Sequence, residues 1–144
     1  NPDQCRWDDL VIVTLSEFGR TTIENDDNGT DHAEASVMFV AGGGVKGYDS
    51  GSGRPGVFGC GPSDPVAWQT GQTGSMFQTE KRYLKRAIDY RSVLGKVIRD
   101  HLGATQDQLN RIIPGYAKSS EALKAGGVQT ADGVRVQGEP DLML

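Results

Sequence analysis

Two short runs of apolar residues dominate the first third of the chain. The first covers residues 10–15 (LVIVTL) and the second residues 37–41 (VMFVA), and neither alternates with polar positions. Such continuous runs are typical of strands that are covered on both faces, as in parallel α/β sheets. We therefore predict two buried strands, the second ended by Gly42-Gly43-Gly44. The strand residues that we expect in the core are Val11, Val13, Val37 and Phe39.

Helical periodicity appears later, in residues 89–102. Apolar residues recur there at intervals of three and four and form one face. Asp89 can cap the start of this helix, and Gly103 stands where a C-terminal glycine is common. Gly95 lies inside the helix, where glycine costs up to about 1 kcal/mol relative to alanine, and this predicts close packing. The helix residues that we expect in the core are Val93, Leu94, Val97 and Ile98.

The remaining elements are short. A T-x-x-Q capping box at Thr105 and Gln108 predicts a second helix, which Ile113-Pro114-Gly115 ends. Residues 21–31 and 47–74 form polar and glycine-rich loops, and a hairpin is expected around Ala131-Asp132-Gly133. Two strands are too few for a complete sheet. We therefore expect the chain to be the C-terminal part of a larger α/β fold, or a subunit that partner chains complete.

Composition and charge indicate a globular domain and argue against nucleic-acid binding. The chain has 144 residues, of which 36% are hydrophobic and 24% are charged, and its formal net charge is −4. These values are typical of a globular domain. Nucleic-acid binding is not expected, because it usually needs a basic surface, and the one basic cluster, residues 81–86, suits a solvated face. No apolar run approaches the roughly 20 residues that span a bilayer.

The two cysteines, Cys5 and Cys60, leave two alternatives open. They could form one disulfide bond in an oxidising compartment, or they could be two free buried thiols. Their spacing does not indicate a zinc site.

The residues that could carry chemistry follow the first strand and precede the second. Glu17 comes after the first strand, and Asp31-His32 come before the second. If the two strands are neighbours, these three side chains can converge, and carboxylates with an imidazole suit a divalent ion such as Zn²⁺ or Mn²⁺. The alternative is structural: Glu17 forms an ion pair with Arg20 that pins a loop, and Asp31 caps a turn.

Several motifs in one order resemble a known family. The segments VIVTLSEFGRT, NGTDHAEASVMFVAGGGVKG, IDYRSVLGKVIRDHLG and IIPGY are similar to the C-terminal part of the domain of unknown function 1501 family, which is of the sulfatase-like, alkaline-phosphatase-like type. The resemblance covers about residues 7–116. It implies a three-layer α/β/α alkaline-phosphatase-like fold, in which residues 1–116 are the C-terminal part and residues 117–144 form an extended tail.

The resemblance also implies a site. Members of the wider superfamily hydrolyse or transfer phosphate or sulfate esters with two metal ions, held in part by an Asp-His pair at a strand end and by a later His. Here Glu17-Phe18 falls where the pair would be, and His32 falls where the later His would be. Glu17, Asp31 and His32 would then hold one divalent ion (zinc, manganese, magnesium or calcium), and Arg20 would steady the anion. Phe18 cannot ligate a metal and should point into the core.

Two functions therefore stay open. The first is a metal-dependent hydrolase of phosphate or sulfate esters, of which this chain would be a fragment without the nucleophile. The second is a catalytically degenerate relative with a binding or structural role at the cell surface. In both cases the resemblance implies an exported bacterial protein of the periplasm or cell surface. An upstream segment of the same protein, or another chain, would complete it.

Overall fold

A computed structural model of the chain describes residues 6–53, 56–60, 82–116, 123–129 and 135–144. Its elements are short, and most of them are strands of two to four residues. In chain order they are η1 (Arg6–Asp9), β1 (Val11–Val13), β2 (Gly19–Arg20), β3 (His32–Ala33), β4 (Val40–Gly42), α1 (Tyr90–Asp100), α2 (Gln106–Ile112), β5 (Gly126–Gln129) and β6 (Arg135–Gln137).

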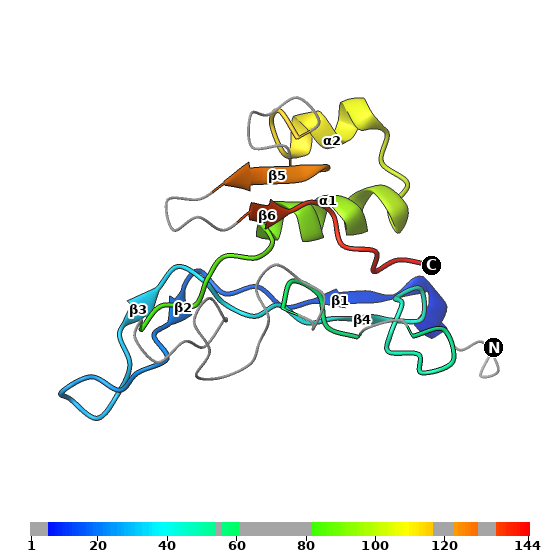
Figure 1. Cartoon of the computed structure of the whole chain (residues 1–144). Coiled ribbons are helices and arrows are strands. Elements are labelled where there is room, and N and C mark those ends of the chain that lie inside the picture. The colour runs from blue at the N-terminus through cyan, green and yellow to red at the C-terminus, as the bar shows by residue number, and fades with distance from the viewer. Residues whose placement is uncertain (1–5, 54–55, 61–81, 117–122, 130–134) are drawn as a thin grey trace.

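The N-terminal segments form a long antiparallel ribbon (Figure 1). β1 pairs with β4, with Val13 opposite Val40, and β2 pairs with β3, with Gly19 opposite Ala33. Between these two pairings the first segment advances by six residues, from Val13 to Gly19, and the second by seven, from Ala33 to Val40. The second segment therefore contains one extra residue, as in a β-bulge. The parallel arrangement that we predicted from the apolar runs is wrong, because β1 and β4 run antiparallel.

The two sides of the ribbon approach each other closely at Gly19, in the segment Ser-Glu-Phe-Gly-Arg that follows the first strand. A Cβ atom at this position would lie 1.6 Å from the carbonyl oxygen of Ala35 on the opposite side of the ribbon. No side chain fits there without moving the backbone. Glycine at position 19 therefore allows the ribbon to close tightly where it passes from the β1–β4 pair to the β2–β3 pair.

Helix α1 covers one face of the ribbon (Figure 1). Val93 and Val97, one helical turn apart, are each only 8% exposed. They share the first core cluster with Leu142 and Met143 from the C-terminal end of the chain. The ribbon residues that pack against this cluster are Val11, Val13, Met38 and Val40.

A second cluster joins α1 and α2. It consists of Leu109, Tyr116 and Leu123, with Ile98 packed against it. Leu109 and Tyr116 have no exposed surface. A Cβ atom at Gly95 would lie 2.3 Å from the Tyr116 ring, so the close packing predicted for this glycine is confirmed.

A partly buried polar network holds the C-terminal segment to the second cluster. The Tyr116 hydroxyl donates to Glu139 at 2.7 Å, and Arg99 donates to the same carboxylate oxygen at 2.5 Å. Burial of the phenol, and then the neighbouring Glu139, raise the pKa of Tyr116. The hydroxyl therefore stays protonated and serves as a donor to the carboxylate.

The helix boundaries agree with the local signals. The Asp89 side chain accepts from the Arg91 amide at the start of α1, and Gly103, with φ +68°, follows the end of that helix. Thr105 and Gln108 form the predicted capping box at the start of α2. Both helix predictions are confirmed, and the predicted hairpin near residues 131–133 corresponds to the antiparallel β5–β6 pair, whose connecting residues lie outside the described part.

The core predictions were right for three of the four helix residues and for two of the four ribbon residues. Val93 and Val97 are buried, and Ile98, Val11 and Val13 pack against the clusters. Leu94 is half-buried and belongs to neither cluster. The predictions for Val37 and Phe39 are wrong, because these side chains are 63% and 68% exposed. They lie on the ribbon face that α1 does not cover.

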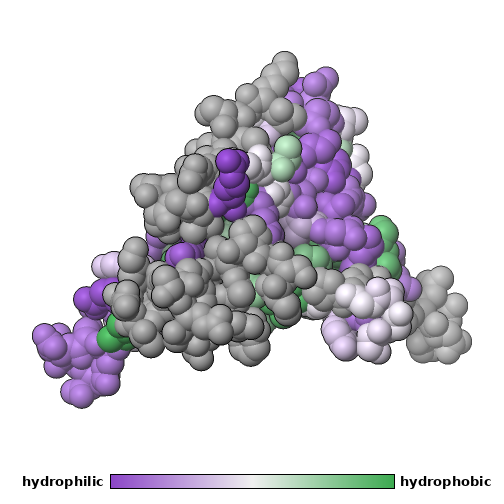
Figure 2. Space-filling model, viewed as in Figure 1, coloured by the Kyte–Doolittle hydropathy of each residue, from purple (hydrophilic) through white to green (hydrophobic). Residues whose placement is uncertain are grey.

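The described residues thus form small antiparallel sheets and two helices, broadly an α/β arrangement. In the view of Figure 2 the helical part carries mostly hydrophilic surface, and hydrophobic patches appear lower down, towards the ribbon. Within residues 117–144, Leu142 and Met143 belong to the core, which the sequence did not indicate. Cys5 lies outside the described residues, so the two alternatives for Cys5 and Cys60 stay open. No helix in the described part is long and apolar enough to cross a membrane.

Candidate functional site

The β2–β3 end of the ribbon carries most of the residues singled out from the sequence. Arg20 pairs directly with His32 across the two strands. Side chains of directly opposite residues lie on the same face of an antiparallel pair, about 4.5–5.5 Å apart at Cβ. Both residues are exposed. The antiparallel ribbon therefore brings together the side chains of Arg20 and His32, which are twelve positions apart in the sequence.

Phe18 forms the base of this arrangement. Its ring stacks on the His32 ring, with the ring centroids 3.8 Å apart and the planes inclined by 21°. The guanidinium carbon of Arg20 lies 5.1 Å from the centroid of the same ring, within the range of a cation–π contact. The prediction that Phe18 points into the core is wrong, because the ring lies against His32 and Arg20. We call Phe18, Arg20 and His32 the cationic face.

Arg20 keeps most of its hydrogen-bonding capacity. One terminal nitrogen donates to the carbonyl oxygen of Thr30 at 2.6 Å, which leaves further N–H groups of the guanidinium directed elsewhere. Within the described residues, no carboxylate forms an ion pair with Arg20 or His32. The alternative ion pair between Glu17 and Arg20 is therefore not formed, and Glu17 is exposed.

The nearest carboxylates have their own arginine partners. Asp31 accepts from Asn25 at 2.9 Å and forms an ion pair with Arg82. The hydrogen bond from Asn25, together with the Arg82 guanidinium, holds the pKa of Asp31 below its ordinary value. Glu34 pairs with Arg86 at 3.1 Å. Residues 82–86 thus run beside β3 and neutralise two acids next to the cationic face.

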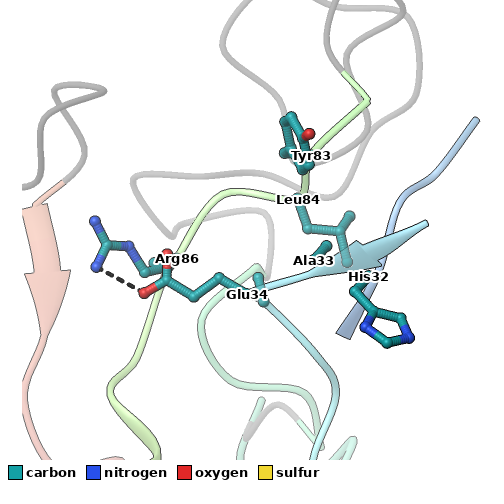
Figure 3. A pocket seen from close by; sticks show the side chains of 7 residues that line it. His32, Ala33, Glu34, Tyr83, Leu84 and Arg86 are labelled. Atoms are coloured by element: carbon teal, nitrogen blue, oxygen red, sulfur yellow. Dashed lines mark hydrogen bonds and ion pairs between the residues drawn. The ribbon is translucent and has the colours of Figure 1, made fainter. Parts of the chain in front are cut away.

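A shallow pocket of about 460 Å³ adjoins this site. Residues 32–35 form one wall, and Tyr83, Leu84 and Arg86 form the other. Figure 3 shows the Glu34–Arg86 ion pair at one side of the pocket and Leu84 facing Ala33 across it. The His32 ring extends from the other side of β3, away from Leu84. The pocket and the cationic face therefore adjoin each other along β3, and His32 belongs to both.

Sequence reasoning missed Arg82 and Arg86. The basic cluster at residues 81–86 suited a solvated face, and no local signal links it to acids 51 and 52 positions earlier. Only the fold places these arginines against β3. The ion pairs are exposed, and such pairs usually contribute less than about 1 kcal/mol to stability. Their role here is to neutralise Asp31 and Glu34.

The three predicted metal ligands do not form a metal site in this arrangement. Asp31 is engaged by Asn25 and Arg82, and His32 is stacked on Phe18. No group of three or more His, Cys, Asp or Glu side chains in the described part of the chain is placed to hold a metal ion. Metal binding by Glu17, Asp31 and His32 stays a prediction, and it would require Asp31 to leave Arg82.

One comparison bears on the family. Residues 3–54 match the family model described as "Protein of unknown function (DUF1501)". This match supports the resemblance to the domain of unknown function 1501 family, and it covers the ribbon that carries the cationic face. No curated protein and no solved structure matches the chain.

Proposed function

We propose that the cationic face binds the anionic group of a phosphate or sulfate ester, as part of an exported bacterial protein of the sulfatase-like type. One observation carries this proposal. Arg20 and His32 are exposed cross-strand neighbours that form no ion pair with a carboxylate in the described part, whereas the adjacent Asp31 and Glu34 each pair with an arginine. The site therefore offers positive charge to an external anion.

The chemistry of the two side chains suits such a ligand. Guanidinium groups donate parallel hydrogen bonds to two oxygens of a phosphate or carboxylate, and this geometry favours planar or tetrahedral oxyanions. The imidazole of His32 adds a ring N–H group that can donate a further hydrogen bond to the anion. Two hydrogen bonds to charged groups contribute about 3–6 kcal/mol together. Since immobilising the ligand offsets part of this, we expect a dissociation constant of about 1–10 mM.

Binding, without cleavage, is the activity that we propose for these residues. They hold and orient an anion, and Phe18 fixes the position of both cationic side chains by stacking. This corresponds to a binding or structural role at the cell surface. An upstream segment of the same protein, or another chain, would supply what the ester chemistry requires.

A metal-dependent phosphate- or sulfate-ester hydrolase is the second candidate. The exposed Glu17, which lacks an ion pair in the described part, is the observation that favours it. Glu17, Asp31 and His32 would hold a divalent ion (zinc, manganese, magnesium or calcium). Because Asp31 is held by Arg82, we assign no catalytic step through that ion. If this candidate is right, Arg82→Ala should increase zinc binding in calorimetry, and His32→Ala should remove it.

Calorimetric titration with inorganic phosphate and sulfate tests the main proposal. The variants are Arg20→Gln and His32→Gln, and Arg111→Gln on α2 is the matched control because Arg111 is also an exposed arginine. We expect millimolar binding by the parent chain, a loss of at least fivefold with Arg20→Gln, a smaller loss with His32→Gln, and no change with Arg111→Gln. Equal losses with Arg20→Gln and Arg111→Gln would mean non-specific charge attraction and would refute the proposal.

A further inference from the structure

The turn between β2 and β3 carries an exposed asparagine–glycine pair, Asn28-Gly29. Figure 1 shows this turn extending beyond the two strands, away from the helices. Asn28 has φ +59°, in the left-handed region that asparagine tolerates better than most residues. Its side chain forms no hydrogen bond within the described residues. The side-chain carbonyl carbon of Asn28 is therefore accessible to the backbone nitrogen of Gly29, which follows it directly.

The turn has room for a side chain at Gly29. Gly29 does not have the positive φ at which glycine is favoured. A Cβ atom there would meet only the Oδ1 atom of Asn25, at an ordinary contact distance of 3.7 Å. The effect of this glycine is instead chemical. Because it has no Cβ atom, its nitrogen can approach the side chain of Asn28 with less steric hindrance than the nitrogen of any other residue.

Asn25 closes the turn and holds the nitrogen of Gly29. Its Oδ1 atom accepts from the amide of Asp27 at 3.1 Å and from the amide of Gly29 at 2.9 Å. Its own amide donates to the carbonyl oxygen of Gly29 at 2.8 Å. The nitrogen of Gly29 becomes a nucleophile when it loses its proton, and a hydrogen bond from this N–H group stabilises the protonated form. Asn25 therefore slows any reaction between Gly29 and Asn28.

We propose that Asn28 is a site of spontaneous deamidation and that Asn25 controls its rate. The nitrogen of Gly29 gives its proton to water and forms a bond to Cγ of Asn28. The bond between Cγ and Nδ2 breaks, and Nδ2 takes up one proton and leaves as ammonia. Water then opens the cyclic imide at either of its carbonyl carbons, which gives aspartate or isoaspartate. Both products add negative charge beside Asp26 and Asp27, and isoaspartate also routes the main chain through Cβ.

Peptide mapping by mass spectrometry tests the proposal on the full chain, incubated in buffer at mildly alkaline pH. We expect Asn28 to deamidate in the parent chain and about fivefold faster in Asn25→Ala, which loses both hydrogen bonds to Oδ1. Asn25→Asp should stay near the parent rate, because its carboxylate accepts from the same two amides. Gly29→Ala should be roughly tenfold slower, since the added Cβ atom hinders the approach of the nitrogen.

Asn110 is the internal control, because it lies inside α2 and precedes an arginine. It should stay intact in every variant. In urea, where the turn is unfolded, the parent chain and Asn25→Ala should deamidate at Asn28 at the same rate. Absence of deamidation at Asn28 in both folded chains, or equal rates in the two, would overturn the proposal. An equal rise at Asn110 would mean general unfolding and would overturn the role of Asn25.

Discussion

The substitution Gly95→Ala tests the packing between α1 and the second core cluster. The new methyl group would lie 2.3–2.4 Å from three atoms of the Tyr116 side chain. These atoms are at the far end of the side chain, but Tyr116 has no exposed surface and its hydroxyl is bound to Glu139. The ring cannot move without losing either its packing or this hydrogen bond.

Two opposing effects, helix propensity and overpacking, determine how much Gly95→Ala changes the free energy of unfolding. Alanine is favoured over glycine inside a helix by about 1 kcal/mol. Overpacking a well-filled core costs about 1–3 kcal/mol, and losing the hydrogen bond to a charged group costs about 1.5–3 kcal/mol more. We therefore expect Gly95→Ala to lower the free energy of unfolding by about 1.5–5 kcal/mol, although the helix propensity of alanine alone would stabilise the protein.

Urea unfolding, followed by circular dichroism, measures this difference. Gly47→Ala is the control, because a Cβ atom at Gly47 has no neighbour within 4 Å, and it should change the free energy by less than about 0.5 kcal/mol. Repeating Gly95→Ala in a Tyr116→Leu background should give a much smaller loss, since the clashing ring is absent. A neutral or stabilising effect of Gly95→Ala in the parent chain would show that Tyr116 does not pack on α1 as described.

Three further predictions concern the helices and the β2–β3 loop. Leu109→Ala should destabilise the protein by about 2–5 kcal/mol, because Leu109 is fully buried; a denaturant midpoint close to that of the parent chain would contradict this. Thr105→Ala removes the capping box and should cost about 1 kcal/mol, which amide exchange in α2 would detect as faster exchange. The pKa of Asp31 is lowered from its ordinary value of 3.8. The ionised carboxylate therefore stabilises the fold at pH values above 3.8, and this stabilisation is lost as the pH falls below that value. In an NMR titration, Asn25→Ala should raise the pKa of Asp31, and an unchanged value would mean that the hydrogen bond is not formed in solution.

The helices could be predicted from the sequence because their signals are local. Asp89, Gly103 and the Thr105–Gln108 pair act within one turn of the helix ends that they define. Gly95 was informative for the same reason: a glycine in a helix interior is unfavourable unless a neighbour requires the space. Only the identity of that neighbour, Tyr116, needed the structure.

The ribbon was harder to predict because continuous apolar runs have two explanations. Residues 10–15 and 37–41 fit strands of a parallel sheet with helices on both sides. They fit equally well a two-stranded ribbon with α1 on one face and exposed apolar side chains on the other, which is what the structure has. The pattern does not encode strand direction, so the prediction of a parallel pair was wrong and the exposure of Val37 and Phe39 was missed.

The candidate site was predicted in part. The sequence predicted that Arg20 and His32 lie at one site if the strands are neighbours, and the antiparallel ribbon pairs these two residues directly. The partners of Asp31 and Glu34 could not be predicted, because Arg82 and Arg86 come from more than 50 positions away. A site whose charge balance depends on distant residues requires the tertiary structure.

Proton–nitrogen NMR of the arginine side chains tests the central claim most directly. Inorganic phosphate is titrated into the labelled chain at constant ionic strength, while the Nε–Hε resonance of each arginine and the ring protons of His32 are followed. We expect saturable shifts of the Arg20 and His32 resonances with one common dissociation constant of about 1–10 mM, and no saturable shift of Arg111. Absence of a saturable shift at Arg20, or shifts of similar size at all exposed arginines, would contradict an anion site at the cationic face.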